Sequence, residues 1–283
     1  MSERIYCSEQ NPEEPMIGTA DRVDVWVLLE YKPTWKARAI EEGSLAADTR
    51  RWLEENLGAL DRSGLKARPQ LIRRPELDRD GLSLFIGTEN GLLRVSGANY
   101  AAFETLRLTD VLANPDAYEA VAEPHYFVCT NGQRDVCCAR FGLPLYAGLR
   151  ERVGRRVWQV THLGGHRFAP NVLVLPQGAL YGRVQESSLD EFVARVEARE
   201  LAFDVLRGRS WLEPEAQAAE ALSRRSDLRP VGIEHAGELA TVRFEDRGGE
   251  TLDVLVRRDA EPLQVLKSCA DEALKPVRPY LPG

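Results

Sequence analysis

The sequence predicts a mixed α/β protein in which one structural unit occurs twice and is followed by a smaller α+β segment. Strand-like and helix-like apolar stretches follow the same order in residues 1–118 and in residues 119–206. From residue 207 to residue 283 the pattern changes to one helix and several alternating strands. Because 283 residues exceed the usual size of one domain, we expect three parts with these boundaries.

The first copy begins with an apolar strand, VWVLL. In the helix that follows, leucines and a tryptophan recur on one face. Two later strands flank Asn90 and Gly91, a pair that is typical of a tight hairpin turn. The expected elements are a strand at 25–29, a helix at 45–60, strands at 69–73, 82–87 and 92–96, and a helix at 100–112.

The second copy repeats this order, with a hairpin around Gln177 and Gly178. The order of elements resembles the thioredoxin fold, so the resemblance implies two tandem thioredoxin-like units. A proline before the third strand of that fold also has a counterpart here, which makes the Ala169–Pro170 bond a candidate cis peptide. The expected elements are strands at 126–129, 157–161, 172–175 and 180–184, and helices at 143–154 and 189–201.

The third part, residues 207–283, is expected to be a small α+β segment. It opens with a helical stretch for which Ser210 is the expected N-cap. Three alternating strands follow at 230–235, 239–246 and 252–258, with a hairpin turn at 247–249. The proline-rich tail, KPVRPYLPG, is expected to be an extended strap.

The composition and net charge of the chain bear on whether its binding partner is a nucleic acid or a membrane. With 37 basic and 44 acidic residues the net charge is −7, and no basic block is present, which argues against a nucleic-acid partner. The longest apolar runs are too short to span a membrane. Residues 1–16 are polar and lack the apolar core of a signal peptide. We therefore expect a cytoplasmic protein without a membrane partner, while its oligomeric state stays open.

Three of the five cysteines, Cys129, Cys137 and Cys138, lie within ten positions, and His162 and His166 follow in the motif HLGGH. In a thioredoxin-like sheet the first two strands of a unit are close neighbours, so the loops that follow them meet at one end of the sheet. Gly164 and Gly165 allow the backbone to approach a bound group closely. The remaining cysteines, 7 and 269, are isolated near the two ends of the sequence and are expected to be free structural or surface thiols.

Spacing alone leaves the kind of metal open. Two cysteines and two histidines can hold a structural zinc ion. Zinc modules usually place their cysteines two to four residues apart, whereas eight residues separate Cys129 from Cys138. An iron–sulfur cluster, which is larger than a zinc ion because it contains iron atoms and bridging sulfides, also fits this long loop.

The chain resembles the sucrase/ferredoxin-like family. The matching segments are CTNGQRDVCCARFGLPLY, VTHLGGHRFAPNVLVLPQGALYGRV and LRGRSWLEPEAQAAE, with a looser match near CSEQNPEEPMIGTADRVDVWVLLEY. The resemblance implies a 2Fe–2S cluster held by Cys129, Cys138, His162 and His166. It favours Cys138 over Cys137, because the family spacing is C-x8-C.

The implied function is one-electron transfer or redox sensing, with a redox protein or a small oxidant as partner. Two neutral imidazoles reduce the negative charge around the cluster. In Rieske centres such a ligand set raises the potential from about −400 mV to roughly −150 to +300 mV. The first copy of the unit has no cysteine or histidine at the matching places, so we expect a scaffold or docking role for it.

Two enzyme classes are weaker alternatives to an electron-transfer protein. A thioredoxin-type oxidoreductase needs C-x-x-C at a helix start, and this chain has adjacent cysteines instead. A sucrase would need two carboxylates about 5 to 10 Å apart across a sugar cleft, and no motif singles out such a pair. Among nearby residues, we expect Asp135 to be a solvated loop charge, His125 to be structural, and Trp158 and Phe168 to serve packing.

Overall fold

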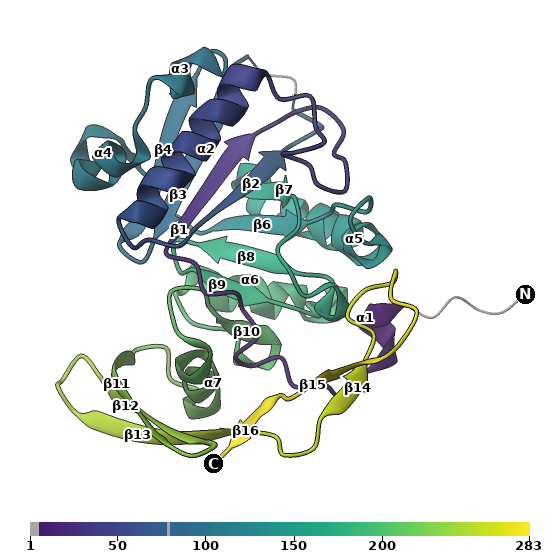
Figure 1. Ribbon diagram of the computed structural model, residues 1–283, viewed down its shortest axis with the longest axis vertical. Coiled ribbons are helices and arrows are strands. Elements are labelled where there is room, and N and C mark those ends of the chain that lie inside the picture. Colours follow the sequence, from purple (N-terminus) through teal and green to yellow (C-terminus); the bar gives the residue numbers. More distant parts are fainter. Residues whose placement is uncertain (1–5, 78–79) are drawn as a thin grey trace, which may run out of the picture.

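The computed structural model describes residues 6–77 and 80–283, so the first five residues of the polar amino terminus lie outside the described part. One large mixed sheet runs through the molecule, and helices cover its faces (Figure 1). The strands of this sheet are β1 Val25–Glu30, β2 Ala67–Arg73, β3 Leu82–Thr88, β4 Gly91–Gly97, β5 Glu119–Ala120, β6 His125–Cys129, β7 Val157–Val160, β8 Val172–Leu175, β9 Ala179–Tyr181 and β10 Leu206–Arg209. The α-helices are α1 Cys7–Gln10, α2 Ala47–Arg62, α3 Ala101–Glu104, α4 Leu108–Ala113, α5 Val136–Val153, α6 Leu189–Glu197 and α7 Pro214–Ser223.

The order of strands repeats within the large sheet, which reads β10-β9-β8-β6-β7-β2-β1-β3-β4-β5. In each half the first two strands are parallel neighbours, and the next two add to the sheet antiparallel: β2-β1-β3-β4 in one half and β7-β6-β8-β9 in the other. The halves join where β2 and β7 pair antiparallel, with Ile72 opposite Val160. The repeated order expected from the sequence is therefore observed, within one continuous sheet.

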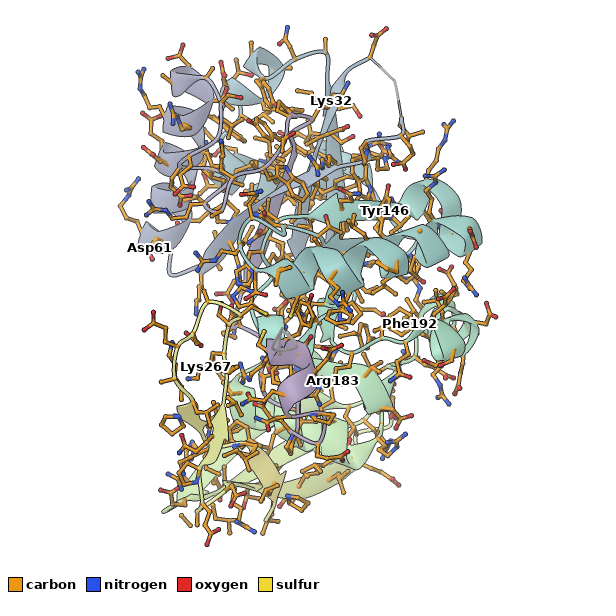
Figure 2. The ribbon with its side chains drawn as sticks, turned by 90° about the vertical axis from the view of Figure 1, so that its right-hand side faces the viewer. Lys32, Asp61, Tyr146, Arg183, Phe192 and Lys267 are labelled. Atoms are coloured by element: carbon orange, nitrogen blue, oxygen red, sulfur yellow. The ribbon has the colours of Figure 1, made fainter. Side chains whose placement is uncertain are left out.

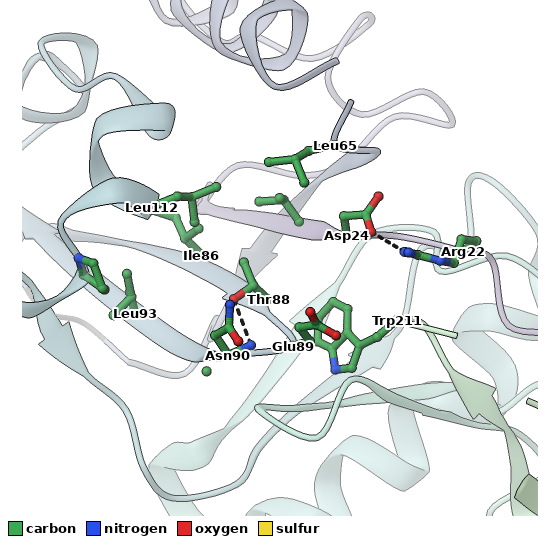
Figure 3. Close-up of a pocket in the computed structure, with 13 residues that line it drawn as sticks. Arg22, Asp24, Leu65, Ile86, Thr88, Glu89, Asn90, Leu93, Leu112 and Trp211 are labelled. Carbon is green, nitrogen blue, oxygen red and sulfur yellow. Dashed lines mark hydrogen bonds and ion pairs between the residues drawn. The ribbon is translucent and has the colours of Figure 1, made fainter. Parts of the chain in front are cut away.

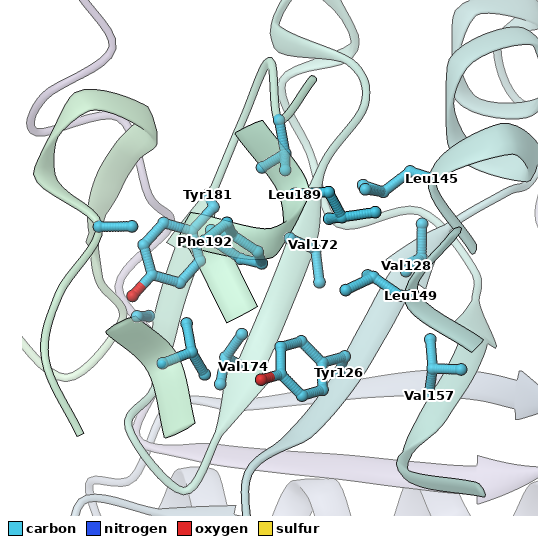
Figure 4. Close-up of a cluster of buried hydrophobic side chains, with 14 of the residues drawn as sticks. Tyr126, Val128, Leu145, Leu149, Val157, Val172, Val174, Tyr181, Leu189 and Phe192 are labelled. Carbon is cyan, nitrogen blue, oxygen red and sulfur yellow. The ribbon is translucent and has the colours of Figure 1, made fainter. Parts of the chain in front are cut away.

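Because successive side chains of a strand point to opposite faces of the sheet, neighbouring residues of β6 pack into different hydrophobic clusters. Tyr126 and Val128 of β6 face α5 and α6, where they pack with side chains such as Leu149 and Phe192 (Figure 4). Cys129 belongs to an apolar cluster that also contains Trp26 and Trp158 and crosses the junction of the two halves. A third cluster lies beneath α2. The last residue of β6 therefore points away from the core beneath α5.

Two helices differ from expectation. The single helix expected at 100–112 is divided into α3 and α4, because side chains of α2 bind the backbone between them: Trp52 Nε1 donates to the Leu106 carbonyl at 2.9 Å, and Asn56 Oδ1 accepts from Leu108 N at 2.6 Å. Helix α5 begins at residue 136 instead of 143. Its start is capped by Asp135, which accepts a hydrogen bond from Cys137 N at 2.9 Å.

The expected N-cap at Ser210 is wrong. Residues 206–209 form β10, which pairs with β9, and Ser210 Oγ accepts a hydrogen bond from Trp26 Nε1 at 2.9 Å. Helix α7 starts instead at Pro214, a residue suited to the first helical position because its nitrogen needs no partner there. The predicted cis bond at Ala169–Pro170 is confirmed, and Leu175–Pro176 is also cis.

A smaller sheet, β11-β12-β13-β16, packs on α7 and contains the three expected strands. The tail forms short extended strands, as expected of a strap. No helix in the described part of the chain is long and apolar enough to cross a membrane. The bounds are β11 Arg229–Ala236, β12 Leu239–Glu245, β13 Thr251–Arg258, β14 Leu263–Val265, β15 Lys275–Val277 and β16 Tyr280–Pro282.

The junction of the two halves gives a stability prediction. Ile72 is fully buried opposite Val160, so Ile72→Ala should lower the free energy of unfolding by about 2–5 kcal/mol through lost burial and a cavity. Leu255→Ala is the control, because Leu255 is 42% exposed in β13 and should change stability by about 0.5 kcal/mol or less. Urea unfolding followed by circular dichroism measures both. Equal midpoints for the two variants would show that the halves are not joined through this pair.

Candidate metal centre

Four cysteine and histidine side chains come from three segments of the second half. Cys129 is the last residue of β6, and Cys138 lies in the first turn of α5. His162 follows the end of β7 by two residues, and His166 begins a short 3-10 helix. Because β6 and β7 are parallel neighbours with Cys129 opposite Val160, both strands deliver their loops to the same edge of the sheet.

The structure brings all four predicted side chains together. The ligand atoms of Cys129, Cys138 and His162 lie within 4.8 Å of one another. The imidazole of His166 stacks on that of His162, with 4.1 Å between ring centroids and 15° between planes. Its Nδ1 lies 3.6 Å from the sulfur of Cys138. Three of the four ligand atoms therefore meet at one point, and the imidazole of His166 lies beside them, against His162 and Cys138.

Burial and hydrogen bonding divide this site into an inner and an outer part. Both cysteines are buried, whereas the two histidines are partly exposed. His162 Nδ1 is buried and has no hydrogen-bond partner among the described residues. A buried ring nitrogen without a partner carries a desolvation cost that a bound ligand relieves. This orphaned atom fits a site that holds a metal.

The two thiols titrate as a pair. The hydrogen bond from Cys138, with smaller effects of His162 and the Leu163 backbone N–H, lowers the pKa of Cys129 well below its ordinary value despite burial. The same hydrogen bond, together with burial, raises the pKa of Cys138. The first proton is therefore lost from Cys129, which gives one thiolate at the inner wall of the site.

Burial also sets the charge of the outer histidine. Burial, and then the proximity of His162, lower the pKa of His166 to about 4. A neutral imidazole is the form that binds a metal, so at neutral pH this ring is available without losing a proton. The donor set is thus compatible with two thiolates and neutral histidine.

The glycine pair shapes the loop between the histidines. Gly164 and Gly165 have φ values of 85° and 69°, in the left-handed region that favours glycine. A Cβ at Gly165 would lie 2.6 Å from Nη2 of the buried Arg207. That guanidinium donates to the Gly164 carbonyl at 3.0 Å and to Asn171 Oδ1 at 2.9 Å, and Asn171 Nδ2 donates to the Gly165 carbonyl at 2.9 Å. The sequence alone does not identify Arg207 and Asn171 as residues that support this loop. Nothing in the local pattern separates Arg207 from Arg209.

The first half of the chain also holds this loop. Thr161 N donates to the Leu71 carbonyl and Leu71 N donates to Thr161 Oγ1, both at 3.0 Å. Arg68 Nη2 donates to the His162 carbonyl at 3.0 Å, and the same guanidinium pairs with Asp21. The backbone on either side of His162 is therefore fixed by residues of β2.

Cys137 does not face this centre. Its sulfur lies 3.6 Å from that of Cys7 and 3.2 Å from that of Cys269. The hydrogen bonds from Cys7 and Ser8 lower the pKa of Cys137 to about 6, against the effect of burial. Cys7 and Cys269 are free thiols, as expected, but they are not isolated in space, because the fold brings segments near both ends of the chain to Cys137.

Asp135 also differs from expectation, since its side chain is buried instead of solvated. Hydrogen bonds from Ser268 Oγ, Cys269 N and Cys137 N lower the pKa of this carboxyl although burial opposes them. The structural interpretation of His125 is confirmed: its Nδ1 lies 3.1 Å from the Glu123 carbonyl oxygen. Trp158 and Phe168 are fully buried, as expected of packing residues.

A cavity of about 330 Å³ lies at the start of β1 and the end of β3, beside the hairpin of Thr88 and Asn90 (Figure 3). Trp211 forms one wall, and Asp24 and Arg22 form a salt bridge at its rim. None of its lining residues belongs to the cysteine–histidine group. The metal centre and this cavity are therefore separate features.

The glycine loop yields a prediction. Gly165→Ala should destabilise the protein by more than the roughly 1–2 kcal/mol of left-handed backbone strain, because the new methyl group meets a fully held guanidinium. Gly237→Ala is the matched control, since φ there is 65° and nothing lies within 4 Å of the added Cβ. Urea midpoints compare the two variants. Equal losses would show that Arg207 yields freely and does not shape the loop.

Comparison with known proteins places the chain in a family. No curated protein and no solved structure matches it. A sequence model described as sucrase/ferredoxin-like matches residues 16–208, which is more than half of the chain and includes the four converging side chains. The match ends within β10, the strand that carries Arg207. The chain therefore belongs to the sucrase/ferredoxin-like family.

Proposed function

We propose that Cys129, Cys138, His162 and His166 bind a 2Fe–2S cluster and that the protein acts in one-electron transfer or redox sensing. The observation that carries this proposal is the convergence of two sulfurs and two imidazoles from three separate segments. Family membership supports it, because the family description includes ferredoxin. When bound, such a cluster supplies a one-electron couple.

The chain's own residues fit this cofactor. Cys129 and Cys138 provide two buried sulfurs, and Nδ1 of His162 is a buried ring nitrogen with no hydrogen-bond partner among the described residues. His166 is neutral at physiological pH and needs no deprotonation before binding. Two anionic and two neutral ligands leave less negative charge than four thiolates, so an added electron is accepted more easily.

Partial exposure of the histidines favours a redox role. The side chain of His166 is 12% exposed at the edge of the site, while the sulfurs are covered. A partly exposed imidazole at the edge of the site gives a redox protein or a small oxidant close approach to the metal, and it also allows proton exchange with solvent. We infer that the partner docks over this histidine edge.

Zinc at the same four residues is the second candidate. One observation favours it: the ligand atoms of Cys129, Cys138 and His162 lie within 4.8 Å of one another. A single tetrahedral ion with bonds of about 2.0–2.3 Å needs ligands that lie this close. Metal content distinguishes the two candidates directly.

We further infer that the chain is a tandem of two thioredoxin-like units. The repeated order β2-β1-β3-β4 and β7-β6-β8-β9 supports this, since both halves combine a parallel pair with an antiparallel hairpin. The first unit contains no cysteine or histidine between residues 25 and 112. Its role is to support the site, because Arg68 and Leu71 bind the backbone around His162.

Ligand substitutions test the cluster. Anaerobically purified protein should be red-brown, with about two irons and two sulfides per chain. Cys129→Ser and Cys138→Ser should lose colour and iron, because each removes one buried thiolate. Cys137→Ser is the matched control, since its sulfur faces Cys7 and Cys269, and it should retain both. Iron and sulfide analysis with visible absorption provides the measurement.

The opposite pattern, with iron kept in Cys138→Ser and lost in Cys137→Ser, would contradict the assignment of Cys138. Colourless wild-type protein with one zinc per chain, unchanged after anaerobic reconstitution with iron and sulfide, would favour the zinc candidate instead.

Histidine ligation predicts a potential that depends on pH. Oxidised iron favours the deprotonated imidazole, so above the imidazole pKa the oxidised state gains stability and the midpoint potential falls. The slope should approach about 59 mV per pH unit for one proton per electron in the alkaline range. The midpoint at neutral pH should lie well above about −400 mV, the value of four-cysteine plant-type ferredoxins. Potentiometric titration across pH measures both quantities.

Variants separate histidine ligation from a general effect of pH. His166→Cys adds a thiolate charge, so its midpoint should be lower and its pH slope smaller. His235→Gln is the control, because His235 is exposed in β11, far along the chain from the site. A wild-type midpoint that does not change between neutral and alkaline pH would argue against histidine ligands.

A further inference from the structure

A second group of potential metal ligands lies beside the first. Cys7 of α1, Cys137 of α5 and Cys269 near the carboxyl end bring their sulfurs together, although 262 positions separate the first from the last. The three sulfur–sulfur distances are 3.2, 3.5 and 3.6 Å. With a carboxylate oxygen of Asp135, the four ligand atoms lie within 4.8 Å of one another.

These distances suit a shared ion better than a disulfide. A disulfide requires about 2.05 Å between sulfurs, and all three cysteines are free. Sulfurs about 2.3 Å from a tetrahedral zinc ion lie roughly 3.8 Å apart, and the observed distances of 3.2, 3.5 and 3.6 Å are somewhat shorter than this. Three thiolates and one carboxylate are also a donor set that zinc accepts.

Neighbouring groups already orient these ligands. Ser8 Oγ donates to the Cys137 sulfur at 3.3 Å, and Cys7 N donates to the Cys269 sulfur at 3.4 Å. Asp135 Oδ2 accepts from Ser268 Oγ at 2.7 Å and from Cys269 N at 2.8 Å. Outer hydrogen bonds of this kind fix ligand geometry in zinc sites. Hydrogen bonds therefore hold these four side chains in place around a common point.

Apolar residues bury the side of this cysteine group that faces the protein interior. Cys7 and Cys137 are buried, and apolar side chains surround them: Tyr6, Phe141, Ala169 and Leu266. The segment around Lys267 passes beside α1 (Figure 2). There Leu266 N donates to Gln10 Oε1 at 2.7 Å, and Asn11 Nδ2 donates to the Gln264 carbonyl at 3.2 Å. Segments near the two ends of the chain therefore meet at this point.

We propose that Cys7, Cys137, Cys269 and Asp135 form a second metal site that binds one structural zinc ion. The ion fastens α1 and the loop between β14 and β15 to the start of α5. No open coordination position is needed, which distinguishes a structural site from a catalytic one. This proposal is independent of the proposed cluster, because the two ligand sets share no residue.

Metal analysis of single variants tests the second site. Protein produced with zinc and iron supplied should contain about one zinc per chain in addition to the cluster iron. Cys7→Ser and Cys269→Ser should lose most of the zinc and keep the iron. Cys129→Ser should show the reverse, and it serves as the matched cysteine-to-serine control. The two substituted positions lie in a terminal helix and a loop, so loss of the whole fold is not expected.

Zinc-edge X-ray absorption identifies the ligands. The proposal requires three sulfur neighbours at about 2.3 Å and one oxygen at about 2.0–2.2 Å, both in the wild type and in Cys129→Ser. Two sulfurs and two nitrogens, with zinc lost in Cys129→Ser and kept in Cys7→Ser, would place the zinc in the other site and overturn the proposal. Zinc-free wild-type protein that also fails to bind added Zn²⁺ under reducing conditions would overturn it as well. Failure of the cluster would appear separately, as missing iron in the wild type.

Discussion

The position of β7 in the sheet is the constraint on which the site depends. This strand is buried along its whole length and pairs parallel with β6 on one side and antiparallel with β2 on the other. The first pairing delivers His162 to the place where β6 ends at Cys129. The second connects the same loop to the first half of the chain through Leu71 and Arg68. A shift of this one strand would move both the ligands and their support.

The start of α5 adds a second constraint. Asp135 caps the helix, so Cys137 and Cys138 enter its first turn, where consecutive side chains point about 100° apart. One sulfur consequently faces the histidines and the other faces Cys7 and Cys269. Adjacent cysteines cannot easily bind one metal together. Here each of the two belongs to a different group of potential metal ligands.

Much of the fold could be predicted from local pattern, whereas the surroundings of the site could not. Apolar alternation located the strands of both copies. The thioredoxin-like order of strands predicted that the cysteine and histidine loops meet, and the family resemblance selected Cys129, Cys138, His162 and His166. The division between α3 and α4 depends on Trp52 and Asn56 of a distant helix, which no local pattern reveals. Likewise, the meeting of Cys7 with Cys269 follows from the paths of both chain ends. The local pattern favours Ser210 as an N-cap. Its observed role, accepting a hydrogen bond from Trp26, is a tertiary contact that the local pattern does not reveal.

The two proposed sites meet electrostatically at Asp135. Its Oδ2 lies 3.9 Å from His166 Nδ1, and the same carboxylate belongs to the cysteine triangle. A carboxylate near a ligating imidazole increases the basicity of that ligand and stabilises the more oxidised metal. Zinc bound to this carboxylate would withdraw negative charge from His166 and favour the reduced state. Occupancy of the second site would therefore raise the potential of the first, and this gives the attachment of the chain ends a direct effect on redox behaviour.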